Sequence, residues 1–257
     1  MVGLHGASSN ENSFMDFYLG LFKKYAEERG YIALAPIGPG PFGGYWDVGG
    51  QEVMDVIDLV EKIYPINRKR IYLTGHSMGG GGTMFLGFNH AKHFAALAPV
   101  AGFFGQNAQL AKAKKMPLLI AQGQQDRIVT VESARQLHRA ARELKMPNVK
   151  YIELEGVGHI QIMASVMKDV FDWFDTYSKK WSPARAKIMS DDRTEAWTEV
   201  HARTGSSRSR AYTLRPYVGP EACAAGFPNK PRPYIRETEE STATYISTKV
   251  TYLYQTP

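Results

Sequence analysis

The sequence predicts an α/β fold in which helices cover both faces of a mostly parallel sheet. Over residues 1–180, short apolar runs typical of strands alternate with longer segments whose apolar residues recur at helical spacing. This alternation favours a parallel sheet, because the chain must cross back over the sheet between neighbouring strands. The runs are also apolar along most of their length, which is typical of strands buried on both faces.

The first part of the chain supplies two strands and two helices. Residues 1–6 indicate the end of a buried strand that runs straight into a turn. Residues 13–28 carry apolar and aromatic side chains at helical spacing, and Gly30 ends this predicted helix. Residues 31–36 are the next expected strand, and a loop rich in Gly and Pro follows. The helix predicted over residues 48–63 has one apolar face.

The second part of the chain repeats the same unit. The strands expected here are residues 70–74, 94–100, 117–121 and 149–154. Glycines and a helix follow the first of these strands at once. Two further helices are predicted over residues 131–144 and 162–177, and the last of them closes the domain.

The composition changes after residue 180. Residues 181–257 contain only nine Leu, Ile, Val or Phe, against 17 Ser or Thr. Such a low apolar share predicts a weakly structured extension. Within it, residues 242–254 are dense enough in β-branched and aromatic residues for a strand or hairpin. We therefore expect a folded domain over residues 1–180 and a separate extension over residues 181–257.

Charge and cysteine content exclude several classes of function. The net charge of +6 comes from scattered basic residues, and groups such as Arg68–Arg70 are too short for a nucleic-acid-binding patch. The single Cys223 excludes an intramolecular disulfide framework and a Cys-rich zinc site. No run of about 18 apolar residues predicts a membrane span. No signal peptide precedes the first strand, although the N-terminus looks incomplete, so the compartment stays open.

The strongest chemical signal is the G-x-S-x-G motif Gly75–Gly79, which stands between a predicted strand and a predicted helix. In this context Ser77 lies on a tight turn that projects its hydroxyl away from the backbone, while the glycines allow neighbouring segments to approach closely. The positive end of the following helix lies beneath an oxyanion formed there. The motif therefore predicts a serine nucleophile.

A serine nucleophile needs a base, and the base needs an acid that orients it. His159 follows the strand at 149–154, and Asp126 follows the strand at 117–121. Both therefore lie at the carboxyl-terminal edge of the sheet, where the catalytic groups of open α/β sheets gather. The chain order of nucleophile, acid and base is also the one that accompanies this motif.

Other motifs are weaker. The glycines after Ser77 lack the lysine of a P-loop, and a dinucleotide-binding loop would stand near the first strand. Ser165–Lys168 matches S-x-x-K, but the partner motifs of that hydrolase class are absent. His90 and His93 are expected at the surface and not on a metal. The acidic residues of the closing helix look solvent-facing (Asp169, Asp172 and Asp175).

An oxyanion hole needs two backbone N–H donors. The residue after the nucleophile, Met78, is expected to supply one of them. The turn that follows the first strand is expected to supply the other, from Ala7, with Ser8 as the weaker candidate.

Taken together, these motifs resemble the α/β-hydrolase superfamily. The resemblance rests on Leu4–Gly6, Gly75–Gly80, Gly123 with Asp126 and Val129, and Gly158–His159. Residues 70–80 and 94–102 are similar to polyhydroxybutyrate-depolymerase-like and feruloyl-type esterases, dienelactone-hydrolase-like proteins and prolyl-oligopeptidase-like hydrolases. The resemblance implies a three-layer α/β-hydrolase sandwich that lacks the first strands of the family, which would leave residues 31–36 as an exposed edge.

These features predict a serine esterase that acts on a small-molecule ester through an acyl-enzyme, with no metal or organic cofactor. Only 16 residues separate Val100 from Pro117, which is too short for a large helical lid and favours an open site. Aromatic residues of the surrounding loops are expected to wall this site (Phe42, Tyr45, Trp46, Phe103 and Phe104). The alternative for these residues is packing in the core.

Two alternative functions stay open. A peptidase of the prolyl-oligopeptidase kind would use the same triad. A non-catalytic or truncated protein with this fold would keep the residues without the activity. The acyl and alcohol specificity and the oligomeric state are not encoded in any recognisable motif.

Overall fold

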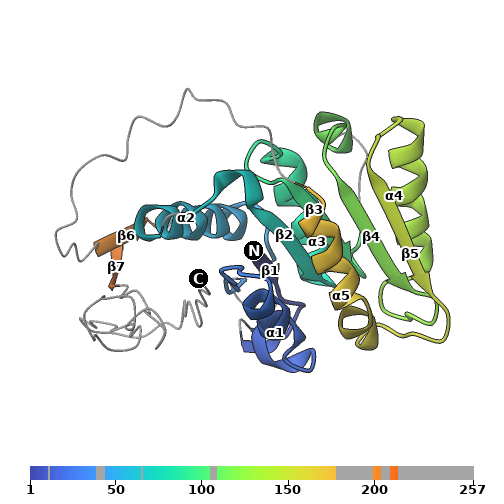
Figure 1. The fold of residues 1–257 in the computed structure, drawn as a ribbon, viewed down its shortest axis with the longest axis horizontal. Helices are drawn as coiled ribbons and strands as arrows, with labels where there is room; N and C mark the ends of the chain where they lie inside the picture. Colours follow the sequence, from blue (N-terminus) through green and yellow to red (C-terminus); the bar gives the residue numbers. More distant parts are fainter. Residues whose placement is uncertain are drawn as a thin grey trace.

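The computed structural model of the protein describes residues 1–177 except residues 11, 39–43, 65 and 105–108, together with strands at 199–203 and 209–213. Its centre is a five-stranded sheet in the order β1-β2-β3-β4-β5 (Figure 1). The strands are β1 (Val2–Leu4), β2 (Tyr72–His76), β3 (Ala96–Val100), β4 (Leu118–Gly123) and β5 (Val149–Leu154). All neighbouring strands are parallel, so their carboxyl ends meet at one edge of the sheet.

Helices cover both faces of this sheet. On one face pack α2 (Val48–Ile63), α3 (Met78–Asn89) and α4 (Val131–Glu143), and on the other pack α1 (Leu21–Glu28) and α5 (Gln161–Asp175). Each face has its own buried apolar cluster. Leu73 and Leu97 belong to the first cluster, whereas Tyr72 and Ala96 belong to the second, as the alternation of side chains along a strand requires. The predicted three-layer α/β arrangement is therefore confirmed.

The helix predicted over residues 13–28 is divided in two. A π-helix, η1 (Ser13–Phe17), is followed by a turn in which Leu19 and Gly20 have φ angles of 59° and 64°, and α1 then begins at Leu21. Both pieces still bury aromatic side chains together, with the rings of Phe14 and Phe22 4.8 Å apart. The apolar spacing persists across the break, so it could not indicate that the helix is interrupted.

The predicted strand over residues 31–36 is not a regular strand. It forms a single parallel bridge, between Leu34 and Val2. The Gly3 N–H donates to the Leu34 carbonyl at 2.8 Å, and the Leu34 N–H donates to the Met1 carbonyl at 2.9 Å. The segment therefore extends the sheet beyond β1, and it remains largely buried.

The other predicted elements are found near their expected positions. α2 and β5 have the expected bounds, whereas β2 is displaced by two residues because a 3₁₀ helix, η2 (Arg68–Arg70), occupies its expected start. A second 3₁₀ helix, η3 (Leu110–Ala113), lies between β3 and β4. Within the described residues, none of the helices combines the length and apolar character that a membrane span requires.

The C-terminal part contributes a hairpin that the sequence did not indicate. β6 (Glu199–Arg203) pairs with β7 (Ser209–Thr213) in antiparallel register. The strand or hairpin predicted over residues 242–254 lies outside the described residues.

Candidate active site

Ser77 lies at the junction of β2 and α3. Its backbone angles, φ 58° and ψ −116°, are unusual for a side-chain-bearing residue and turn the chain sharply from strand into helix. Two hydrogen bonds hold this turn: the Ser77 N–H donates to the Val100 carbonyl at 3.0 Å, and the Ser77 carbonyl accepts from the Gly81 N–H at 3.0 Å. The strain is consistent with a side chain that must be presented at the edge of the sheet.

His159 and Asp126 meet Ser77 at this edge. The His159 Nε2 atom lies 2.9 Å from the Ser77 Oγ atom, and the His159 Nδ1 atom lies 2.6 Å from the Asp126 Oδ2 atom. Both His159 and Asp126 are buried. The carboxylate can only accept, so Nδ1 carries the proton and Nε2 is free to accept the Ser77 hydroxyl proton. The structure thus brings the three predicted residues into one hydrogen-bonded chain.

Several donors hold the Asp126 carboxylate in place. Its Oδ1 atom accepts from the N–H groups of Ile128 and Val129, each at 2.9 Å. Its Oδ2 atom also accepts from the Gln122 Nε2 atom at 2.8 Å. The same amide nitrogen donates to the Val129 carbonyl at 2.7 Å. The carboxylate is therefore oriented from three sides before it contacts His159. The sequence did not indicate Gln122, because its type carries no catalytic signature.

The two predicted oxyanion donors belong to the first residue of α3 and to the turn after β1. Met78 is the first residue of α3, and the first N–H groups of a helix have no partner within it. The turn that contains Ala7 lies beside the nucleophile, because a Cβ atom built at Gly6 would lie 3.5 Å from the Ser77 Cβ atom. The arrangement suits the stabilisation of an oxyanion by Met78 and Ala7.

His5 fixes the shape of this turn. Its Nε2 atom accepts the Gly38 N–H at 2.9 Å, so its Nδ1–H donates to the Gly6 carbonyl at 2.8 Å. The His5 N–H donates to the Tyr45 hydroxyl at 3.0 Å. His5 and Tyr45 are both buried, so this anchoring is shielded from water.

The aromatic residues predicted to wall the site divide into two groups. Tyr45 and Phe104 are buried in the core, which favours the alternative of core packing for these two residues. Trp46 and Phe103 are exposed, and both lie beside the first turn of α3: a Cβ atom built at Gly81 would contact the Trp46 ring at 3.4 Å and the Phe103 carbonyl oxygen at 3.7 Å. Phe42 lies outside the described residues.

Further apolar side chains are exposed in the segments that follow the strands. All large exposed hydrophobic residues of the described part follow the carboxyl end of a strand or of the bridged segment 31–36 (Phe17, Leu19, Trp46, Val48, Phe103, Ile128 and Ile160). Single exposed apolar residues are ordinary on a protein surface. Only the aromatic members of the loops were identified from the sequence.

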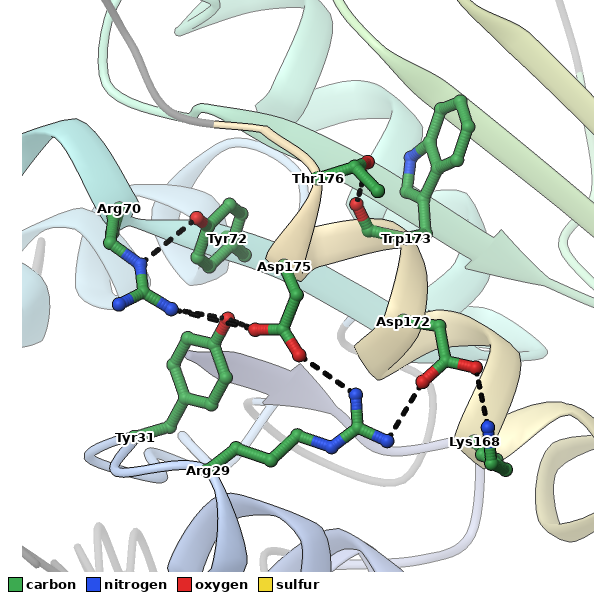
Figure 2. Close-up of polar contacts among 9 residues, drawn as sticks. All are labelled: Arg29, Tyr31, Arg70, Tyr72, Lys168, Asp172, Trp173, Asp175 and Thr176. Atoms are coloured by element: carbon green, nitrogen blue, oxygen red, sulfur yellow. Dashed lines mark hydrogen bonds and ion pairs between the residues drawn. The ribbon is translucent and has the colours of Figure 1, made fainter.

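The alternative residues of the closing helix take other roles. Asp172 and Asp175 form ion pairs with Arg29, and Asp175 also accepts from Tyr31 (Figure 2). Asp169 pairs with Lys150 at 2.8 Å. The hydroxyl of Ser165, from the S-x-x-K match, donates to the backbone carbonyl of Gln161. In the part of the chain that is described, no three His, Cys, Asp or Glu side chains form a group that could hold a metal ion.

Comparison with known proteins adds a family match. Residues 47–160 match the Dienelactone hydrolase family. This stretch contains Ser77, Asp126 and His159. The resemblance predicted from the motifs is therefore confirmed.

A curated relative is an esterase in part. The bifunctional acetylxylan esterase/xylanase XynS20E of Neocallimastix patriciarum is 26% identical over 215 residues, which are 69% of this chain and 31% of that protein. This chain thus spans about a third of the length of that relative.

Solved structures share the architecture. A thermostable esterase has a TM-score of 0.59 at 23% identity, with 69% of this chain and 54% of that chain covered. A ferulic acid esterase has a TM-score of 0.57 at 16% identity, with coverage of 68% and 83%. SOBER1 of Arabidopsis thaliana has a TM-score of 0.55 at 20% identity, with coverage of 68% and 96%. At these identities the likeness shows the fold alone.

Proposed function

This chain has the α/β-hydrolase fold, and we propose that within this fold it is a serine hydrolase that cleaves carboxylic esters. Several of the similar proteins are named as esterases, among them a bifunctional acetylxylan esterase/xylanase, a thermostable esterase and a ferulic acid esterase. Those names describe the relatives. For this chain, the proposal depends on the residues at the edge of the sheet.

The observation that carries the proposal is the continuous hydrogen-bonded chain from Ser77 through His159 to Asp126, with lengths of 2.9 and 2.6 Å. A nucleophile needs its base within hydrogen-bond reach, and the base needs a partner that fixes its tautomer. Both conditions are met by side chains that lie 33 and 82 residues apart in the sequence.

In the proposed reaction, the Ser77 Oγ atom attacks the ester carbonyl while the His159 Nε2 atom accepts its proton. Asp126 stabilises the resulting imidazolium. The proton then passes from His159 to the leaving alcohol, and an acyl-enzyme remains on Ser77. Water, deprotonated by His159, attacks the acyl group and releases the acid.

The N–H groups of Met78 and Ala7 bind the oxyanion of both tetrahedral intermediates in this proposal. The first turn of α3 adds the positive end of a helix dipole. The loss of one such donor typically reduces turnover by about 10²–10³. Trp46 and Phe103 would contact the acyl or alcohol group from the side of α3.

The test is hydrolysis of short p-nitrophenyl esters by the purified chain beside the Ser77→Ala variant. We expect activity that Ser77→Ala abolishes, since loss of the nucleophile of a triad costs about 10⁶ in turnover. A proline-anilide substrate belongs in the same assay. Cleavage of the anilide without ester hydrolysis would favour the peptidase alternative, and equal rates for both proteins would favour a non-catalytic protein.

A further inference from the structure

His76, the residue before the nucleophile, has no place in the triad, yet its side chain contacts the residue that carries the base. The His76 Nε2 atom lies 2.7 Å from the His159 carbonyl oxygen. On its other side, the His76 Nδ1 atom lies 2.9 Å from the Tyr18 hydroxyl. The ring is 4% exposed, and its centroid lies 4.7 Å from that of the His159 ring.

The partners fix the tautomer of this ring. A carbonyl oxygen can only accept, so the His76 Nε2 atom carries the proton and donates to His159. The Nδ1 atom is then an acceptor, and the Tyr18 hydroxyl donates to it. Burial lowers the pKa of His76 to about 4, although the hydrogen bond to the His159 carbonyl acts in the opposite direction. The titratable groups that face the ring are Tyr18, His159 and Asp126.

The loop that carries His159 is held from two sides. On the side of β4, the Gln125 N–H donates to the Val157 carbonyl at 3.0 Å. On the side of β2, the contact that the structure gives is the one from His76. Because His76 directly precedes Ser77, this contact links the backbone carbonyl of the base, His159, to the residue next to the nucleophile.

We propose that His76 is a positioning residue, which sets the distance between His159 and Ser77 by holding the His159 carbonyl, with Tyr18 orienting the His76 ring. This inference rests on the proposed hydrolase function. His76 stays neutral near pH 7, so it adds no positive charge beside the imidazolium that forms on His159. The site therefore contains two adjacent histidines with different roles: His159 transfers a proton, and His76 holds His159 in place.

Two variants test the hydrogen bonds of the two His76 ring nitrogens separately. In His76→Gln, the amide nitrogen can take the place of Nε2 and donate to the His159 carbonyl. In His76→Asn, the shorter side chain reaches only toward Tyr18. Each variant leaves one buried partner without its hydrogen bond. If the role of His76 is purely structural, kcat should therefore fall by a similar factor in both variants. If His76 positions His159, the loss of kcat should be larger in His76→Asn than in His76→Gln.

The measurement is kcat and KM for p-nitrophenyl acetate, with a pH profile of kcat/KM. We expect kcat of His76→Asn to fall by about 100-fold at unchanged KM, since a small misplacement of a catalytic group has an effect of this size. His76→Gln should keep most of the wild-type kcat and the same acid limb. Equal losses in the two variants, or an acid limb that disappears in His76→Gln, would overturn the proposal.

Amide hydrogen exchange of the loop 155–160 gives a readout that does not need activity. We expect faster exchange in His76→Asn than in His76→Gln, and Tyr18→Phe should lie between Asn and the wild type. If the wild-type chain shows no hydrolysis that depends on Ser77, the proposed function fails, while the exchange data still test the contact. If exchange is the same in all variants, the positioning role fails even where hydrolysis is intact.

Discussion

Gly79 of α3 lies directly against Leu4 of β1: a Cβ atom built at Gly79 would come within 2.0 Å of the Leu4 carbonyl oxygen. That oxygen belongs to the backbone and cannot move aside. Gly79→Ala should therefore push α3 away from β1, which displaces both Met78 and the turn at Ala7. We expect a loss of about 3 kcal/mol in unfolding free energy, measured by chemical denaturation.

Gly81, one half-turn further along α3, is the matched control. A Cβ atom built there would make only ordinary contacts, at 3.4 Å from the Trp46 ring. Gly81→Ala should leave the fold intact and stabilise it by up to about 1 kcal/mol, because alanine favours a helix. Equal destabilisation by both changes would mean that the helix, and not its contact with β1, limits stability.

Asp126→Asn should reduce kcat by about 10⁴ at nearly unchanged KM. The amide would donate to His159 Nδ1, so the ring would carry its proton on Nε2 and could no longer accept from Ser77. Asp169→Asn, in the closing helix, removes a carboxylate that pairs with the partly exposed Lys150 and should leave kcat unchanged. A loss in Asp169→Asn and none in Asp126→Asn would contradict the proposed acid. Stopped-flow or steady-state ester hydrolysis measures both.

Because of His76, the free energy of unfolding should decrease as the pH is lowered from 6.5 to 4. Its pKa is lowered by burial to about 4, from an ordinary value of 6.5. Between these values the unfolded chain binds a proton that the folded chain does not, so unfolding becomes easier as the pH falls. The expected contribution is about 3 kcal/mol, present above pH 6.5 and lost by pH 4. Urea titrations at pH 7 and pH 4 should show a smaller change for His76→Gln, and an identical change would disprove the assignment.

The polar cluster at the end of α5 should stabilise the edge of the sheet. Asp175 accepts from Arg29 at 2.8 Å and from Tyr31, which also accepts from Arg70 at 2.8 Å (Figure 2). Asp175→Asn removes the charge from this cluster and should lower the unfolding free energy by about 1–2 kcal/mol. The more exposed ion pair of Asp169 with Lys150 serves as the comparison and should contribute at most about 1 kcal/mol.

The layered fold could be predicted because its signals are local. A run such as residues 117–121 is apolar enough to be a buried strand by itself, and residues 48–63 define a helix face without reference to any neighbour. The break after Phe17 could not be predicted, since Phe14 and Phe22 pack together whether or not the helix continues. The bridge at Leu34 depends on the neighbouring strand β1, which is only three residues long.

The same contrast holds at the candidate site. Ser77, Asp126 and His159 each follow a strand, so the parallel topology alone brings them to one edge. The contact between Tyr18 and His76 joins residues 58 positions apart and has no local signature. Tyr45 and Trp46 are neighbours of similar character, yet one is buried and the other exposed, because the direction of a loop side chain depends on the tertiary packing around it.

The side chain of Phe103 should select substrates with an apolar acyl group. Phe103 is 70% exposed, and its backbone carbonyl lies with the Trp46 ring beside the first turn of α3, so we expect an acyl group bound there to contact the Phe103 side chain. Phe103→Ala should raise KM for p-nitrophenyl butyrate by about 10-fold, the effect of losing roughly 1.5 kcal/mol of apolar contact, and should change KM for the acetate little. Phe17→Ala, at 72% exposure on η1, is the control of matched size. If both variants raise KM equally, the whole apolar edge binds the substrate and the contact is not specific to Phe103.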